Sequence, residues 1–275
     1  MTSTSVADSA DWLGAPLPRK EDMRLVMGDG KYLGDIILPG MLHAIFVRSE
    51  YAHARIKGID KSEAEMMQGV IKVYTGAELQ STMKSMPQDV LLPNLPAKFP
   101  TFWPLASDKV KFHGEPVALI IARDKYTAVD ASECVYIDYE ELTPVLAPER
   151  ALESDAPQVH EDHTDNEIFA MTFTGGETED AQNQNDLEVE RIFKTADVVV
   201  KERFRVHRTG VTPMEPRGVL CEWAESDGLT AYITTQRPHI DRLALTDILD
   251  IPAEKVRGIA PRDQGGGFGI KAPFY

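Results

Sequence analysis

Cysteine is scarce in this chain of 275 residues, which has only Cys134 and Cys221. An iron–sulfur cluster usually takes four thiolates, and a thiolate zinc site is typically built on CxxC motifs, of which the sequence has none. The cysteine count therefore argues against both kinds of metal site in this chain. So few thiols also fit a reducing compartment, and we expect a cytoplasmic protein.

Positive charge and long apolar runs are also in short supply. The chain has 29 Lys and Arg against 44 Asp and Glu, a net charge of −15, whereas nucleic-acid binding requires clustered positive charge. An anionic cofactor remains compatible with this balance, because a local nest of backbone amides can oppose the overall sign. No run of 18 apolar residues occurs, and the first ten residues are polar. We therefore predict neither a membrane span nor a secretory signal.

The remaining composition, 43% hydrophobic and 27% charged residues, is typical of a globular chain with one large or two medium domains. Apolar runs in its first half predict an α+β module. The predicted strands are 41–48, covered on both faces, 54–59, 70–74, the central 116–122 and the half-buried 135–140. The predicted helices are 60–68 and 125–133, the second capped by Asp124. Residues 80–107 are rich in proline and predict a long irregular excursion.

A second module is predicted after residues 151–190, an acidic and polar stretch that we interpret as a solvated linker. Its carboxylates could bind a hard cation, but they lack a regular ligand spacing. Beyond it the sequence predicts a long alternating strand at 196–206, a hairpin of 218–223 and 229–234 turned by Asp227-Gly228, an amphipathic helix at 239–250 and a strand at 256–260.

The last predicted strand leads into Asp263-Gln264-Gly265-Gly266-Gly267-Phe268-Gly269-Ile270-Lys271. Glycine tolerates positive φ and lets another molecule approach the backbone, so consecutive amides can converge on an anion while Phe268 walls a pocket. A loop that only turns a corner is the plainer interpretation. A phosphate-binding loop of a nucleotide-binding protein is a third, although the run lacks the P-loop lysine pattern and a Rossmann context.

Several motifs occur in the order and at the approximate spacing of one enzyme family. Arg19-Lys20-Glu21-Asp22, Gly28-Asp29-Gly30-Lys31-Tyr32, Leu38-Pro39-Gly40-Met41-Leu42 and Gly114-Glu115-Pro116-Val117-Ala118 resemble the α+β hammerhead domain of the molybdenum hydroxylases, which include xanthine dehydrogenase, aldehyde oxidoreductase and aerobic carbon monoxide dehydrogenase. Met214-Glu215-Pro216-Arg217-Gly218, Thr234-Thr235-Gln236-Arg237-Pro238-His239 and Gly265-Gly266-Gly267-Phe268-Gly269 resemble the family's first molybdopterin-binding region.

The resemblance implies the N-terminal part of a large molybdopterin-binding subunit. It divides the chain into a tail at 1–20, a hammerhead domain at 21–148, an acidic linker at 149–190 and a partial molybdopterin-binding domain at 191–275. The overall fold class is then α+β throughout. The match covers about residues 19–148 and 191–275.

The resemblance also gives roles to particular residues. Gln236 matches the glutamine that hydrogen-bonds the oxo ligand of molybdenum, and a carboxamide can donate there without adding a charge. Gly266, Gly267, Phe268 and Gly269 match the loop that lies against the metal and the pterin, where Phe268 shapes the substrate pocket. The implied catalytic residues are Gln236 and Phe268, and no residue of this chain is implied to ligate the metal directly.

Plainer alternatives exist for several residues of these motifs. Gln236 could cap the helix that follows it, and Glu215 could form a local ion pair with Arg217. The others would serve as a helix-start residue (His239), a core filler (Met214) and surface groups (His113 and Glu115). Two positions depart from the family pattern: Gln264 replaces a small apolar residue, and Ala272 replaces the glutamate with which xanthine-type enzymes contact purine.

The family needs a further, longer stretch of chain, which supplies the carboxylate base and most contacts to the cofactor's dinucleotide. The resemblance therefore implies a natural split subunit or a fragment that is inactive alone. It would share a molybdenum-molybdopterin, in the cytosine dinucleotide form, with a C-terminal molybdopterin-binding chain. Iron–sulfur clusters and FAD are expected on other subunits, and the substrate is a small molecule with an electron-poor carbon. A non-catalytic assembly subunit of such a complex is the alternative.

Overall fold

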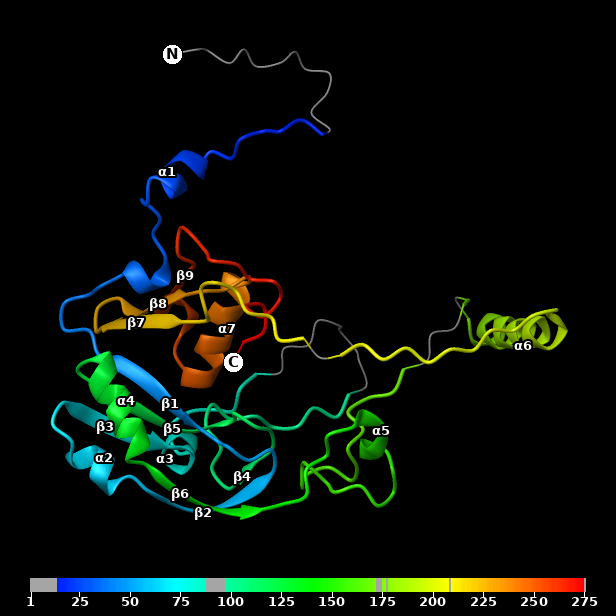
Figure 1. Cartoon of the computed structure of the whole chain (residues 1–275), viewed down its shortest axis with the longest axis horizontal. Coiled ribbons are helices and arrows are strands. Elements are labelled where there is room, and N and C mark those ends of the chain that lie inside the picture. The colour runs from blue at the N-terminus through cyan, green and yellow to red at the C-terminus, as the bar shows by residue number, and fades with distance from the viewer. Residues whose placement is uncertain (1–13, 88–96, 172–174, 177, 208, 275) are drawn as a thin grey trace.

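The computed structural model describes residues 14–87, 97–171, 175–176, 178–207 and 209–274. Two bodies pack against each other, one from the first half of the chain and one from its last third, while a helix projects away from both (Figure 1). That helix is α6, Glu179–Thr195. Among the described residues, no helix has the length and apolar character needed to cross a bilayer.

The first body is built on two antiparallel three-stranded sheets. One has the order β1-β5-β3 and the other β4-β2-β6. The strands are β1 (His43–Arg48), β2 (Ala54–Asp60), β3 (Val70–Thr75), β4 (Lys109–Val110), β5 (Pro116–Ala122) and β6 (Tyr136–Glu141). The helices are α2 (Ser62–Met66), α3 (Gly76–Gln80), α4 (Lys125–Glu133) and α5 (Pro148–Ala151). The described parts of 80–107 contain no helix or strand beyond the end of α3, as predicted.

Strand β5 is central to this body, as its continuous apolar run predicts. Ala118, Ile120 and Ala122 are fully buried in one hydrophobic cluster, and Val117 is fully buried in another. The prediction that the first strand is covered on both faces is wrong. Strand β1 is at an edge of its sheet, and every second side chain of it is exposed, including Phe46 at 45%.

The helix-start signal before α4 is confirmed. The Asp124 carboxylate accepts a hydrogen bond from the Thr127 amide at 2.9 Å and another from the Thr127 hydroxyl. These bonds satisfy a backbone donor that the first turn of a helix leaves unpaired, and they lower the pKa of Asp124.

The second body is a three-stranded sheet of order β7-β8-β9 with one helix packed against it. Strands β7 (Val219–Ala224) and β8 (Gly228–Ile233) form the predicted antiparallel hairpin. Helix α7 (Pro238–Leu249) then connects β8 to β9 (Val256–Ile259), with the short 3-10 turn η2 (Ala253–Lys255) between them. Because β8 and β9 are parallel, the unit is a β-α-β crossover, and the carboxyl ends of both strands meet at one edge of the sheet.

The segment between the two bodies contains a helix but not the strand predicted there. The acidic stretch interpreted as a solvated linker includes most of the 17-residue helix α6, which continues to Thr195 and has Thr178 as its cap. The strand predicted at 196–206 is absent, although its sequence alternates as a strand should. A strand needs a neighbour for its backbone groups, and residues 197–207 make no backbone hydrogen bond to another described residue. Periodicity reports which face a strand would bury, but not whether a partner is present.

The N-terminal segment lies against the second body rather than the first (Figure 1). It contains α1 (Asp22–Val26) and the 3-10 turn η1 (Leu33–Asp35). Leu33 packs so closely on Gly218 that a Cβ added there would lie 2.6 Å from Leu33 Cδ2. Arg24 and Lys31 of this segment bond to Asp263, at the start of the glycine-rich loop, and Leu33 bonds to Glu215.

Candidate cofactor site

The glycine-rich loop leaves β9 in a conformation that few sequences allow. Gly266 and Gly269 have φ of +96° and +89°. Phe268 also has a positive φ, +49°, a left-handed conformation that costs a side-chain-bearing residue roughly 1–2 kcal/mol. Its ring packs over Gly266, where an added Cβ would lie 2.6 Å from Phe268 Cε2, and yet the side chain is 73% exposed. The loop therefore holds an aromatic side chain at the surface.

Gln236 and this loop come together because each follows one of the two parallel strands, β8 and β9. The Gly269 amide donates to Gln236 Oε1 at 3.0 Å. Gly267 packs directly against the Gln236 carboxamide, since a Cβ added at Gly267 would be 2.7 Å from Gln236 Cδ. The alternative role as a helix cap is wrong: Arg237 is the N-cap residue of α7, and no side chain caps it. Gln236 instead lies on the loop and is exposed.

Three further hydrogen bonds join the end of β8 to the loop. The Gln236 amide donates to the Lys271 carbonyl at 3.0 Å. Gln264 Nε2 donates to the Thr235 carbonyl at 2.7 Å, and Arg237 Nε donates to the Ala272 carbonyl at 2.7 Å. Gln264, which departs from the family pattern, thus tethers the loop through a polar contact.

Glu215 supports the loop from below. Its Oε2 accepts from Lys271 Nζ at 2.9 Å and from the Gly265 amide at 3.0 Å, while Oε1 accepts from the Leu33 amide at 3.2 Å. The Lys271 side chain is fully buried and that of Glu215 is 13% exposed. Burial by itself would raise the pKa of Glu215, but the bonds from Lys271, Gly265 and Leu33 outweigh it and leave this pKa below its usual value. Glu215 therefore has a structural role in an ion pair, as the plainer alternative predicts, but the pair recorded for it is with Lys271 in the loop and the alternative named Arg217.

Asp263 fixes the start of the loop to the N-terminal segment. Arg24 donates two hydrogen bonds of 2.6 Å to its carboxylate, from Nη1 and Nη2, and the Lys31 amide donates a third at 2.7 Å. The side chains of Arg24 and Asp263 are 18% and 7% exposed. The Arg24 guanidinium holds the pKa of Asp263 well below its usual range. Sequence reasoning missed this contact, because the two residues are 239 positions apart.

The remaining residues of the motifs have mostly structural positions. His239 begins α7 and is exposed, and His113 is exposed in a turn, as the plainer alternatives predict. Met214 is 95% exposed and fills no core. Glu115 is 7% exposed rather than a surface group; burial raises its pKa, and its carboxylate accepts from the Lys111 amide.

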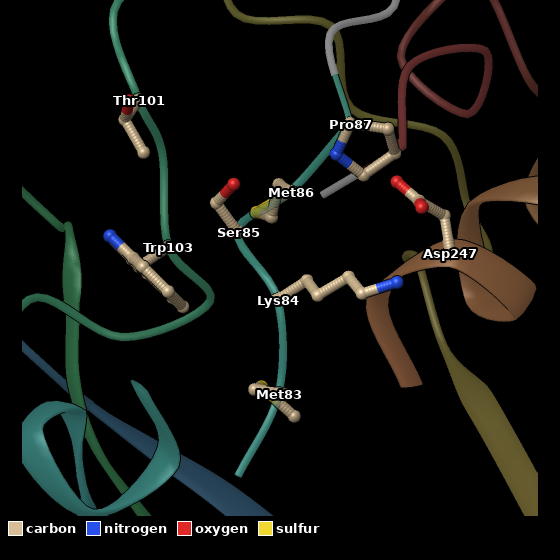
Figure 2. Close-up of a pocket in the computed structure, with 8 residues that line it drawn as sticks. All are labelled: Met83, Lys84, Ser85, Met86, Pro87, Thr101, Trp103 and Asp247. Carbon is tan, nitrogen blue, oxygen red and sulfur yellow. The ribbon is translucent and has the colours of Figure 1, made fainter. Parts of the chain in front are cut away.

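A hollow of about 570 Å³ lies elsewhere, between the segment 83–87 and the end of α7. Figure 2 shows Lys84 extended toward Asp247 across it, with Trp103 and Thr101 on the opposite side. Asp247 is in the last turn of α7, whereas Gln236 precedes the first, so the length of a 12-residue helix, about 18 Å, separates them. This hollow is not the site at the loop.

The loop's own backbone can bind an acceptor-rich ligand. The amides of Gly266, Gly267 and Phe268 donate to no other described residue. Gln236 presents a further donor, because its Oε1 is taken by Gly269 and Nε2 bonds to no described residue. The described residues contain no cluster of three or more His, Cys, Asp and Glu side chains arranged for a metal ion. The loop therefore offers neutral hydrogen-bond donors toward oxygen-bearing ligands.

Two family models match the chain. The aldehyde oxidase and xanthine dehydrogenase a/b hammerhead domain matches residues 27–143, and the molybdopterin cofactor-binding domain matches residues 159–275. The chain belongs to the molybdenum hydroxylase family of aldehyde oxidase and xanthine dehydrogenase. The second match includes Gln236 and the whole glycine-rich loop.

Similar proteins of this family have longer chains. The carbon monoxide dehydrogenase large chain of Afipia carboxidovorans is 37% identical over 288 residues, which cover 100% of this chain and 33% of the relative. The nicotine 6-hydroxylase large subunit of Paenarthrobacter nicotinovorans is 36% identical over 96% of this chain and 30% of the relative. The structure of quinoline 2-oxidoreductase from Pseudomonas putida 86 matches with a TM-score of 0.80 and 30% identity, over 93% of this chain and 31% of that one. The chain thus spans about a third of the length of these relatives.

Proposed function

We propose that this chain is part of the molybdopterin-binding subunit of a multi-subunit hydroxylase or dehydrogenase. The enzyme would oxidise an electron-poor carbon of a small molecule with oxygen derived from water. The observation that carries the proposal is that the Gln236 carboxamide lies beside a loop with three amides that have no partner among the described residues, within the matched molybdopterin-binding domain.

The residues at the loop fit a molybdenum-pterin group. Gly269 has open space where a side chain would be, while Gly265 and Gly267 are closed to any side chain by Glu215 and Gln236. The loop backbone is thus packed against Glu215 and Gln236 at two positions, while at Gly269 a ligand has room to approach. Pterin and oxo groups are rich in acceptors, which is what the free amides and Gln236 Nε2 can bind.

The division of chemistry follows from what the chain contains. When bound, the molybdenum centre supplies the redox chemistry and the activated water-derived oxygen. Gln236 donates a hydrogen bond toward an oxo ligand, the loop amides hold the pterin side, and Phe268 limits the space left for substrate. Each of these groups is uncharged, so the chain positions the reacting groups without acting as their acid or base.

Other polypeptides would complete the enzyme. The general base and the contacts to a cytosine dinucleotide would come from a C-terminal molybdopterin-binding chain, and electrons would pass to iron–sulfur clusters and FAD on further subunits. The relatives named above act, by their names, on carbon monoxide, nicotine and quinoline. We propose a substrate of this general class, a small molecule with an electron-poor carbon.

Replacing Gln236 with alanine in the purified complex tests this function. Loss of a preorganised donor at a reacting centre typically lowers kcat by about 10²–10³-fold. We expect such a loss with the complex assembled and its molybdenum and pterin contents unchanged, assayed with dye acceptors on aldehydes, N-heterocycles and carbon monoxide. His239→Ala, at an exposed neighbouring position, is the matched control. Unchanged turnover of Gln236→Ala would favour the alternative, a non-catalytic assembly subunit.

A further inference from the structure

The segment between the two bodies is an arm of unusual exposure. We define the arm as residues 179–207, which consist of α6 and the extended chain after it. Every residue from 183 to 207 is exposed, and the arm projects into solvent (Figure 1). It nevertheless carries nine large apolar side chains that are each at least 51% exposed: Leu187, Val189, Ile192, Phe193, Val198, Val199, Val200, Phe204 and Val206. So many exposed apolar side chains within one segment point to an interaction site.

Helix α6 has an apolar face without a partner among the described residues. Val189, Ile192, Phe193 and Ala196 are spaced as successive residues along one side of a helix, and the first three are 51%, 51% and 62% exposed. The remaining positions are mostly polar, with ion pairs such as Arg191–Glu188 between them. The helix is therefore amphipathic, and its apolar face is exposed to solvent where another part of a protein would be expected to cover it.

The extended chain after α6 has the pattern of a half-buried strand. One face consists of Val198, Val200, Glu202, Phe204 and Val206, and its four apolar members are 78%, 78%, 87% and 91% exposed. Lys201, Arg203 and Arg205 occupy the alternate face. Backbone donors and acceptors of this stretch bond to no other described residue, so they are open to pairing with the edge of a sheet.

We infer that the arm docks the rest of the molybdenum subunit. The partner is the polypeptide that corresponds to the two-thirds of the relatives' length that this chain does not span. Residues 198–206 add to a sheet of that polypeptide as a β-strand. The apolar face of α6 packs on the same polypeptide. This inference rests on the proposed function, since it assigns a surface to the partner that completes the cofactor site.

Two observations favour this occupant over a second copy of the chain. The arm lies within the matched molybdopterin-binding domain, and the structural match to the carbon monoxide dehydrogenase of Oligotropha carboxidovorans covers 95% of this chain but 32% of that one. The arm thus belongs to a domain that occurs in much longer chains. Two copies of the arm paired in register as adjacent β-strands would also bring Lys201, Arg203 and Arg205 next to like charges, which is destabilising.

The test uses the assembled complex, purified through a tag on this chain. A benzoylphenylalanine introduced at position 204 is photo-crosslinked, and mass spectrometry identifies the polypeptide attached to it. Hydrogen exchange of the 198–206 amides is measured in the same complex. We expect a cross-link to the remaining molybdopterin-binding part of the subunit and exchange at least 100-fold slower than in an unpaired chain.

Paired substitutions complete the test. We expect Val200→Asp with Phe204→Asp to reduce recovery of the partner at least tenfold, whereas Ile37→Asp, a control at a 77% exposed position outside the arm, leaves recovery unchanged. A cross-link to a second copy of this chain, or fast exchange of residues 198–206 in a complex that contains molybdopterin, overturns the inference and leaves the proposed function standing. A complex without molybdopterin overturns both.

Discussion

Replacing Glu215 with alanine removes the acceptor that three donors share beneath the glycine-rich loop. It leaves the Lys271 ammonium fully buried without its carboxylate and frees the amides of Gly265 and Leu33. Breaking a buried ion pair from one side costs about 3–5 kcal/mol, a large share of the 5–15 kcal/mol by which a typical domain is stable. We expect a loss of about 3–5 kcal/mol in the free energy of unfolding, measured by urea denaturation.

A second variant separates the ion pair from the packing around it. Glu215→Leu combined with Lys271→Met removes both charges, and we expect it to be more stable than Glu215→Ala, because no buried charge is left unpaired. Glu225→Ala, in an exposed turn, is the control and should unfold as the wild type does. A Glu215→Ala protein within about 0.5 kcal/mol of the wild type, the size of an ordinary surface effect, would refute the reasoning.

The same pair predicts a pH dependence. The pKa of Glu215 is lower in the folded chain than its ordinary value of 4.5. The folded state therefore favours the ionised carboxylate. The stability that it contributes is fully present above about pH 4.5, the pKa of an unperturbed glutamate, and is lost as the pH falls through the lower pKa of the folded chain. We expect the difference in unfolding free energy between wild type and Glu215→Ala to shrink in that acidic range and to be constant near neutral pH.

Two further predictions concern the same loop. In Gly267→Ala the new Cβ would lie 2.7 Å from Gln236 Cδ, so we expect the carboxamide to move and kcat of the complex to fall about as far as in Gln236→Ala. Arg24→Met removes two of the three hydrogen bonds that the N-terminal segment donates to the Asp263 carboxylate and leaves the one from the Lys31 amide, and we expect faster limited proteolysis of residues 19–33.

The controls for these two variants are Gly34→Ala, where an added Cβ meets nothing within 4 Å, and Arg19→Met, whose side chain is 74% exposed in a surface ion pair. Full activity of Gly267→Ala would show that the position of Gln236 does not matter. Equal proteolysis of Arg24→Met and Arg19→Met would show that the Asp263 contact does not hold the segment.

Local signals predicted much of the fold. The cap at Asp124, the buried run of β5 and the Asp227-Gly228 hairpin are all confirmed, because each depends on residues close in sequence. The strand predicted at 196–206 failed for the opposite reason: its pattern is that of a strand, but the neighbour it needs is not among the described residues. The prediction that β1 is covered on both faces failed for a similar reason, because only the strand order of the sheet places β1 at an edge.

The sequence by itself determined that a glycine-rich loop with one aromatic residue follows the last strand, since glycine alone adopts such turns without strain. Only the tertiary structure decided what holds that loop. The parallel pairing of β8 and β9 brings Gln236 to Gly269, across 33 positions of sequence. The supports at Glu215 and Asp263 come from residues 56 and 239 positions away. The sequence does not indicate which donor a given carboxylate will meet, because an ion pair depends on the distance between its groups in space.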